Sequence, residues 1–305
     1  MKAIVVTDQD AGLAGMKLVE LPEPPAAIND VVVQVYAACI TGDEVSWPST
    51  WTDRAGNDRT PSVPGHELAG VVTALGYGTT GLSVGQRVLG LTDWYRNGAL
   101  AEYVAVEARN LAPLPDDVDF NDGAALVMPG LTAWQGLFQQ GGLQLGQRVL
   151  VHGAAGIVGS MAVQLAREAG AYVIGTGRAA HREATLNFGA NEFVNLDNDV
   201  LEDIGQVDLV FDVLGGDIAT RSLGVIRAGG ILVTIAGPIE AQVAGVLNID
   251  FVVEADRSQL SEIVKRFQEG RLKTNAGSIV TLDNAIATYN SPDRVKGKTI
   301  VRIRS

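Results

Sequence analysis

A short apolar run followed by small residues lies near the middle of the chain. Arg148–Val151 is rich in Val and Leu, and the next residues read His-Gly-Ala-Ala-Gly-Ile-Val-Gly, ending at Gly159. Apolar residues then recur at helical spacing up to Gly170, a residue type common just after a helix. A strand, a turn of small residues and a helix let a pyrophosphate approach the backbone, where free N–H groups bind its charge. The stretch therefore predicts a dinucleotide-binding turn.

The glycine fingerprint of such a turn is G-x-G-x-x-G. Its three positions are Ala154, Gly156 and Gly159, so alanine replaces the first glycine, and Gly153 adds backbone freedom just before it. His152, beneath the turn, is expected to be a packed, hydrogen-bonded side chain. The residues expected to contact the cofactor's phosphates are Gly153, Ala154, Ala155, Gly156, Ile157 and Val158.

A second predicted strand, Ala171–Thr176, ends in Gly177 and Arg178, with Arg182 one helical turn later. NAD sites usually carry Asp or Glu about 20 residues after the turn, where it holds the ribose 2′-hydroxyl. A carboxylate there would repel a 2′-phosphate, whereas a guanidinium can bind it through paired hydrogen bonds. These residues favour NADPH as the cofactor, with Gly177, Arg178 and Arg182 at its 2′-phosphate. The alternative is that Arg178 is a solvated loop residue.

Composition limits the classes of function. The chain has 305 residues, 47% of them hydrophobic, and a net charge of -12, which argues against nucleic acid or an anionic membrane as partner. Cys39 is the single cysteine, so an intrachain disulfide is impossible and a reducing, cytoplasmic location is expected. No apolar run approaches the ~18 residues of a membrane helix. The expected partner is a small-molecule substrate.

The pattern of elements changes along the chain. Residues 1 to about 120 read as short strands separated by Gly, Pro, Asp and Asn, which predicts a mostly antiparallel β-domain. Strands then alternate with helices, beginning with two short helices on either side of Pro129, which predicts a doubly wound parallel sheet. The tail returns to β character. The expected division is a β-domain of residues 1–121 and 271–305, with a Rossmann domain of residues 122–270 inserted in it and the active site between them.

Several stretches together resemble the medium-chain dehydrogenase/reductase family. They are Pro64-Gly65-His66-Glu67-Leu68-Ala69-Gly70-Val71-Val72, Gly85–Gly90, Gly98–Tyr103, Pro129–Trp134, the Gly153–Gly159 turn, and Gly297–Val301. The resemblance implies a GroES-like β-domain joined to an NADP-binding Rossmann domain. It also implies Thr132, Ala236 and Phe251 as further cofactor neighbours, with Phe251 beside the nicotinamide.

Within that family, zinc-dependent alcohol dehydrogenases hold their metal with a Cys three residues before an Asp, with the His-Glu pair, and with a later ligand. Counting back from Asp43, the first position is Ile40, with Cys39 one residue away, and the later ligand maps to Met128 or Pro129. A catalytic zinc usually has three protein ligands of N, S or O type. The chain therefore looks like the zinc-free quinone oxidoreductase, or zeta-crystallin, branch. An irregular site at Cys39, His66 and Glu67 stays open as the alternative.

Aromatic residues in two polar loops are candidates for the substrate pocket. Trp47, Trp51 and Trp94, together with Phe251, suit planar enones and quinones, which bind by stacking and burial. The alternative is that these rings cap the β-domain core. Asp43, Tyr95 and Thr41 are the candidates for donating a hydrogen bond or proton to the reduced oxygen.

These observations predict an NADPH-dependent oxidoreductase that transfers hydride to a quinone or α,β-unsaturated carbonyl without zinc. Two alternatives stay open: a carbonyl or alcohol oxidoreductase of the same family, and a non-catalytic NADPH-binding sensor. The predicted strand Val246–Val253 would leave an apolar sheet edge, which must be covered, so a homodimer is expected.

Overall fold

The computed structural model describes residues 1–291, 293 and 295–304, and it divides the chain into two compact units. The first, here called the β unit, comprises Met1–Met128, Glu254–Gln268 and Ala276–Ser305. The second, the dinucleotide unit, comprises Pro129–Val253 and Glu269–Asn275. Compared with the expected borders, the division adds residues 122–128 and 254–268 to the β unit and gives residues 271–275 to the dinucleotide unit.

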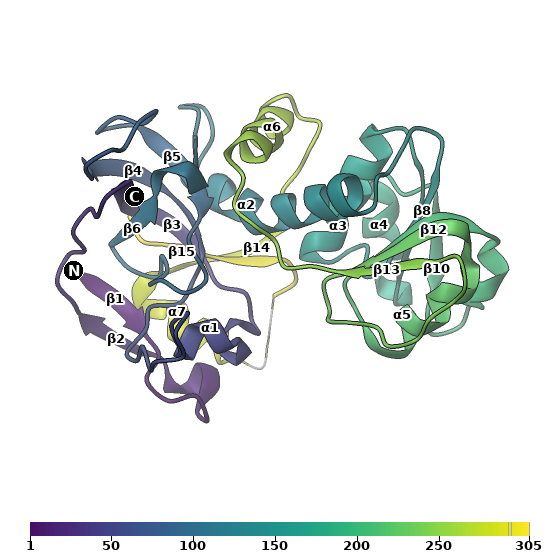
Figure 1. Cartoon of the computed structure of the whole chain (residues 1–305), viewed down its shortest axis with the longest axis horizontal. Coiled ribbons are helices and arrows are strands. Elements are labelled where there is room, and N and C mark those ends of the chain that lie inside the picture. The colour runs from purple at the N-terminus through teal and green to yellow at the C-terminus, as the bar shows by residue number, and fades with distance from the viewer. Residues whose placement is uncertain (292, 294, 305) are drawn as a thin grey trace. The chain divides into compact units, whose positions relative to one another are not determined.

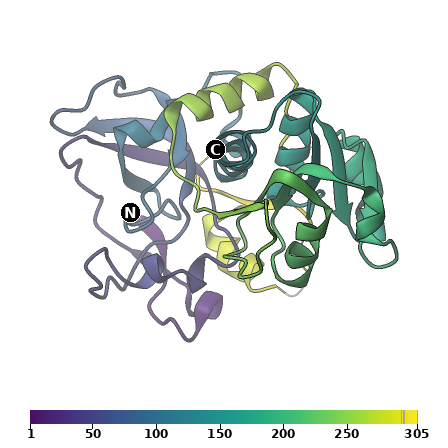
Figure 2. The ribbon, with the colours of Figure 1, turned by 45° about the vertical axis from the view of Figure 1, so that its right-hand side comes forward.

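The β unit is built around a seven-stranded sheet of order β14-β15-β3-β4-β5-β7, with β6 also paired to β3. Its strands are β3 (Asp30–Cys39), β4 (Glu67–Leu75), β5 (Arg87–Leu91), β6 (Tyr103–Glu107), β7 (Leu111–Pro113), β14 (Ala276–Thr281) and β15 (Lys298–Arg302), and β1 (Lys2–Val5) pairs separately with β2 (Lys17–Glu20). All pairs are antiparallel except β14 with β15. The yellow C-terminal strands lie beside the purple β3 (Figure 1 and Figure 2), which confirms that the tail rejoins the N-terminal sheet.

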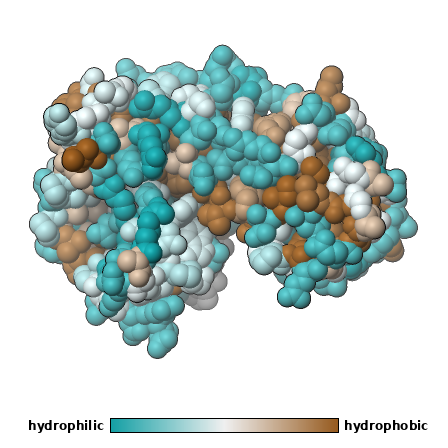
Figure 3. Space-filling model, viewed as in Figure 1, coloured by the Kyte–Doolittle hydropathy of each residue, from teal (hydrophilic) through white to brown (hydrophobic). Residues whose placement is uncertain are grey.

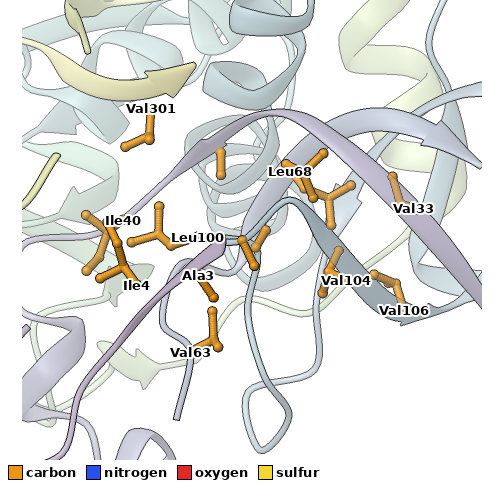
Figure 4. Close-up of a cluster of buried hydrophobic side chains, with 14 of the residues drawn as sticks. Ala3, Ile4, Val33, Ile40, Val63, Leu68, Leu100, Val104, Val106 and Val301 are labelled. Carbon is orange, nitrogen blue, oxygen red and sulfur yellow. The ribbon is translucent and has the colours of Figure 1, made fainter. Parts of the chain in front are cut away.

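Alternating apolar residues of these strands fill one core. Val33, Leu68 and Val104 point from three paired strands into it, and Leu100 and Val301 join them (Figure 4). The helices of this unit are α1 (Pro48–Trp51), α6 (Arg257–Gln268) and α7 (Leu282–Tyr289), with 3-10 turns at Gly12–Gly15, Glu44–Ser46 and Ala108–Asn110. Sequence patterns missed β2 and β7, because both are short and depend on backbone pairing with β1 and β5.

The expected pair of short helices around Pro129 is wrong. A single helix, α2 (Phe120–Trp134), runs through the proline and passes into a π-helical turn at Gln135–Gln140. Proline inside a helix costs roughly 3 kcal/mol because it removes one hydrogen bond. Residues 123–133 are all buried, and the apolar area that they remove from water offsets this cost.

The dinucleotide unit contains a six-stranded, entirely parallel sheet of order β10-β9-β8-β11-β12-β13. Its strands are β8 (Arg148–Val151), β9 (Tyr172–Gly177), β10 (Glu192–Asn195), β11 (Val207–Asp212), β12 (Ile226–Thr234) and β13 (Leu247–Asp250). Its helices are α3 (Ile157–Glu168), α4 (Arg182–Asn187) and α5 (Gly216–Ser222), with 3-10 turns at Ala179–His181, Leu201–Ile204 and Leu223–Val225.

The strand order reverses at β8, whose neighbours are β9 and β11. This reversal is the switch point at which doubly wound sheets bind ligands. The Rossmann fold expected from the sequence is therefore confirmed. The expected strand 246–253 is shorter, since β13 covers only Leu247–Asp250. Among the described residues, no helix is long and apolar enough to cross a bilayer.

Candidate functional site: a dinucleotide turn and a buried polar cluster

The glycine turn lies at the carboxyl end of β8, directly before α3. Gly153 has a φ of 61°, a left-handed conformation that favours glycine. A Cβ on Gly159 would stand 2.2 Å from the carbonyl oxygen of Gly153, so only glycine lets the helix approach the turn this closely. Gly156 is the N-cap of α3 and no side chain caps that end. The first N–H groups of α3 are thus available for a phosphate.

Alanine at the first fingerprint position is accommodated by a glycine on the next strand. Ala154 is fully buried, and Gly175 of β9 lies against its methyl group. A Cβ on Gly175 would lie 2.8 Å from Cβ of Ala154. The absence of a side chain on β9 therefore makes room for the alanine methyl, and the turn keeps its shape.

A residue that sequence reasoning missed holds the turn from outside. The side-chain amide of Asn275 donates to the carbonyl oxygens of Ala155 (3.0 Å) and Gly156 (3.2 Å). Its segment is anchored to α3 by Gln164, whose Oε1 accepts from the N–H of Lys273 at 2.8 Å. No local pattern signals this contact, because the two segments are far apart in the chain.

The loop after β9 contains Arg178 and Arg182, the two arginines named from the sequence. Arg178 is exposed, and among the described residues no acid or hydrogen-bond partner engages its guanidinium. Arg182 lies over the ring of Phe193, 5.8 Å from its centroid, and donates to the carbonyl of Phe193 at 3.5 Å. Gly177 is buried at the end of the strand. Of the two arginines, Arg178 is the one left available to an anion.

The other expected cofactor neighbours also belong to the dinucleotide unit. Thr132 is buried in α2, and Phe251 is half-buried just after β13. The N–H of Ala236 donates to Oγ1 of Thr234 at 3.1 Å, and that hydroxyl donates to the buried carboxylate of Asp212 at 2.8 Å. Asp212 thus holds the end of β12, where Ala236 lies.

In the β unit, a second group of polar residues surrounds His66. Its Nδ1 lies 2.6 Å from Oγ1 of Thr92, and its Nε2 lies 3.4 Å from Oε1 of Glu44. That oxygen of Glu44 also accepts the N–H of Gly65 at 2.6 Å, and its other oxygen lies 3.4 Å from the N–H of Thr41. Glu44, His66 and Thr92 are all buried.

Burial sets the charge of this cluster. It raises the pKa of the Glu44 carboxyl to about 8, although the N–H groups of Gly65 and Thr41 oppose the shift. It lowers the pKa of His66 to about 3, and the nearby charge of Arg59 adds to this effect. Both side chains are therefore neutral at pH 7, which is how a closely placed acid and imidazole avoid the cost of two buried charges.

Glu67 follows His66 in the sequence, but its side chain contacts other residues than the His66 cluster. Its carboxylate forms an ion pair with Nζ of Lys298, and its Oε1 accepts the N–H of Met128 at 3.1 Å. Both charged side chains are buried. Burial lowers the pKa of Lys298, but the charge of Glu67 more than compensates, so the pKa is raised overall.

These residues do not fit a zinc ion. Glu67 is occupied by Lys298, and both ring nitrogens of His66 face other side chains. Among the described residues, no three His, Cys, Asp or Glu side chains are placed to hold one ion. The irregular site considered at Cys39, His66 and Glu67 is thus not assembled.

The three candidate proton donors lie in different places. Thr41 is beside the His66 cluster, and its hydroxyl donates to Sδ of Met128 at 3.4 Å. Asp43 is exposed on the surface. Tyr95 is 37% exposed beneath the guanidinium of Arg54 and lines a groove of about 660 Å³ elsewhere in the β unit. The buried acid of this segment is Glu44, which was not among the candidates drawn from the sequence, whereas Asp43 was.

The three tryptophan candidates for the substrate pocket also lie in different places. The rings of Trp47 and Trp94 meet edge-to-face with centroids 5.3 Å apart, and Trp94 contacts the ring of His66 at 4.9 Å. Trp51 is only 5% exposed, belongs to the hydrophobic core, and donates its indole N–H to the carbonyl of Val45 at 2.7 Å. Trp51 therefore packs the core, as the alternative held, while Trp47 and Trp94 remain half-buried beside His66.

Comparisons with known proteins agree with this architecture. Residues 27–116 match the alcohol dehydrogenase GroES-like domain, and residues 158–269 match the zinc-binding dehydrogenase domain. The chain is similar to the polyketide synthase system protein NorB of Streptomyces orinoci, with 36% identity over 68% of this chain and 10% of that protein. It is also similar to 2-methylene-furan-3-one reductase of Solanum lycopersicum, with 30% identity over 82% of this chain and 64% of that protein. The chain thus spans less than two thirds of both relatives.

A solved structure of quinone oxidoreductase from Pseudomonas syringae shares the fold, with a TM-score of 0.87, 25% identity and 99% of each chain covered. The chain belongs to the medium-chain dehydrogenase/reductase family, a family of oxidoreductases that bind a nicotinamide dinucleotide. The glycine turn fits that cofactor, because a Cβ would fill the space at Gly159 and no side chain caps α3.

Proposed function

We propose that this protein is an NADPH-dependent, zinc-independent reductase of quinones or α,β-unsaturated carbonyls. The observation that carries the cofactor choice is the exposed Arg178 at the end of β9, where NAD-specific sites usually hold an acid. The relatives support the reaction class, since one is named as an enone reductase and a structural neighbour as a quinone oxidoreductase.

The reaction needs a hydride donor and a group that stabilises the reduced oxygen. When bound, the reduced nicotinamide supplies the hydride. Conjugate reduction leaves an enolate, or a phenolate from a quinone, and a donor aimed at that oxygen stabilises it. We assign this role to the hydroxyl of Thr41, whose present acceptor, Sδ of Met128 at 3.4 Å, is a weak one that a substrate oxygen can replace.

The aromatic pair supports a planar substrate. Trp47 and Trp94 are half-buried and hold each other edge-to-face, and His66 supports Trp94 from behind. Such rings provide a rigid apolar wall at small entropic cost. We therefore assign Trp47 and Trp94 to the substrate pocket.

The first experiment is a calorimetric titration of wild type and Arg178→Ala with NADPH and NADH. Wild type is expected to prefer NADPH, and the variant to lose about 10- to 100-fold of NADPH affinity, as expected for charge-assisted hydrogen bonds. NADH binding should not change. Arg221→Ala is the control, because Arg221 lies in the same unit and is already paired with Glu202. Equal binding of both cofactors by wild type would refute the cofactor assignment.

Turnover then separates the remaining functions. NADPH oxidation with a panel of quinones and enones supports the proposal, whereas activity confined to simple ketones or alcohols would favour the carbonyl oxidoreductase. Stoichiometric zinc in protein purified without chelator would overturn zinc independence. Tight NADPH binding with no turnover on any of these substrates would favour a sensor.

We also propose a homodimer formed along β13, and a cytoplasmic location consistent with the single buried cysteine. β13 is an edge strand of the parallel sheet; Leu247, its first residue, is 55% exposed, and Val252, just after it, is 73% exposed. Apolar surface gathers over this region (Figure 3). Light scattering at micromolar concentration checks the dimer, and a monomeric mass would contradict it.

A further inference from the structure

A fully buried imidazole lies directly beneath the glycine turn. His152 follows the last residue of β8, and its side chain has no solvent exposure. Its Nδ1 lies 2.8 Å from Oγ1 of Thr176, and its Nε2 lies 2.6 Å from Oγ of Ser222. One ring therefore joins three elements: the turn after β8, the end of β9, and α5.

The partners determine where the proton of this imidazole lies. The hydroxyl of Ser222 donates its only proton to the carbonyl of Ile218 at 2.7 Å, so toward His152 it can only accept. Nε2 must then carry the hydrogen, and Nδ1 accepts the hydroxyl proton of Thr176. Burial lowers the pKa of His152 to about 4, opposed by the nearby charge of Asp212, which agrees with a neutral ring. Both nitrogens are satisfied without a charge.

The two ends of this link are both parts of the proposed cofactor site. His152 directly precedes Gly153, whose carbonyl accepts the N–H of Gly156 at 2.8 Å within the turn. Thr176 precedes Gly177 and Arg178, and its carbonyl accepts the N–H of Ala154 at 3.1 Å. The imidazole and this backbone bond together hold the phosphate turn against the loop that carries Arg178.

We propose that His152 is a positioning residue for coenzyme specificity, fixing the distance between the pyrophosphate turn and Arg178 through its bond to Thr176. The inference rests on the proposed NADPH function and adds a buried determinant that does not touch the cofactor. The bond to Ser222 holds the ring from the α5 side and does not lead to Arg178. Breaking the two bonds separately must therefore have different consequences.

The test is a titration of Thr176→Val and Ser222→Ala with NADPH and NADH, alongside thermal unfolding of each variant. Thr176→Val removes one buried hydrogen bond, and Ser222→Ala removes two, to His152 and to the carbonyl of Ile218, so both should lower the melting temperature. Thr176→Val should weaken NADPH about fivefold relative to NADH, the equivalent of one neutral hydrogen bond. Ser222→Ala should leave the ratio of the two affinities unchanged. Equal effects of both variants on that ratio, or none from Thr176→Val, would overturn the proposal.

Substitution of the ring itself gives a second measurement. His152→Asn supplies an oxygen at about the reach of Nδ1 and should keep the preference for NADPH, whereas His152→Leu, which offers no acceptor, should lose it. If His152 only fills space, His152→Asn and His152→Leu should show the same ratio of NADPH to NADH affinity. That result would contradict the proposal. Nitrogen-15 NMR of the wild-type imidazole should report the Nε2–H tautomer.

Failure of this inference can be distinguished from failure of the proposed function. If Arg178→Ala leaves NADPH binding unchanged, the 2′-phosphate assignment fails, and the role of His152 in specificity fails with it. If Arg178→Ala weakens NADPH but Thr176→Val does not, only the role of His152 is refuted. In the Arg178→Ala background, Thr176→Val should no longer change the ratio, because the group that it positions is gone.

Discussion

Glu67 and Lys298, from opposite ends of the chain, form an ion pair buried in the core of the β unit. Glu67 begins β4 and Lys298 begins β15, so the pair joins the C-terminal segment to the N-terminal sheet. The same carboxylate accepts the N–H of Met128 in α2. One buried acid therefore ties together three segments of a unit that is discontinuous in sequence.

Removing one charge of this pair should be costly. Lys298→Met leaves the Glu67 carboxylate without its cation, and we expect the free energy of unfolding to fall by about 3–5 kcal/mol. Adding Glu67→Gln should recover much of this loss, because no unpaired charge remains. Urea unfolding measures both, and Lys296→Met, an exposed lysine of the same segment, is the control. A loss as small as that of the control would show that the pair is not formed in solution.

The close approach of α3 to the glycine turn gives a second prediction. In Gly159→Ala the new Cβ would stand 2.2 Å from the carbonyl oxygen of Gly153, so helix and turn must separate. We expect dinucleotide affinity to fall at least about tenfold, since the helix N–H groups no longer reach the phosphate. The control is Gly224→Ala, where a Cβ meets nothing within 4 Å. Unchanged binding in Gly159→Ala would refute this placement of the turn.

Glu44 should make stability depend on pH in an unusual direction. Burial raises the pKa of Glu44 to about 8 in the folded protein. At any pH between the ordinary pKa of a glutamate and about 8, the folded state therefore keeps a proton that the unfolded state has already released. The stabilisation is complete below that ordinary value and is lost as pH rises toward 8. From about pH 7 to about pH 8 the loss should be about 1 kcal/mol, in a range where histidines are mostly neutral in both states.

Two variants isolate this effect. Glu44→Gln keeps an acceptor for the N–H of Gly65 and should remove the fall in stability over this pH range. Asp43→Asn, at the exposed neighbouring acid, should retain it. If Asp43→Asn instead abolished the fall in stability with pH, the buried acid would be Asp43 and not Glu44.

Thr41 should affect the chemical step more than cofactor binding. Thr41→Val removes the hydroxyl that we assign to the substrate oxygen, and kcat should fall about 100- to 1000-fold if one oxyanion donor is lost. The dissociation constant for NADPH should stay constant. Thr41→Ser keeps the hydroxyl and should restore most of the rate. A valine variant with wild-type turnover would exclude this donor.

Local patterns in the sequence were sufficient for the fold class and for the glycine turn between β8 and α3. The change from alternating to helical periodicity separated the two kinds of unit, and the small residues between β8 and α3 marked the turn that we propose for phosphate binding. Both signals are local, because strand and helix faces repeat over a few residues and a turn needs only its own backbone freedom. The charge of Arg178 was likewise visible at the end of a predicted strand.

The tertiary structure decided which side chains meet. It buried Glu44 and exposed Asp43, placed Trp51 in the core, and brought Asn275 onto the glycine turn. It also joined Glu67 to Lys298. These contacts depend on the order of strands in each sheet and on the packing of distant segments, which no local window of residues contains. The sequence by itself therefore determined the fold and the cofactor class, while only the packed chain determined the buried polar contacts that shape the site.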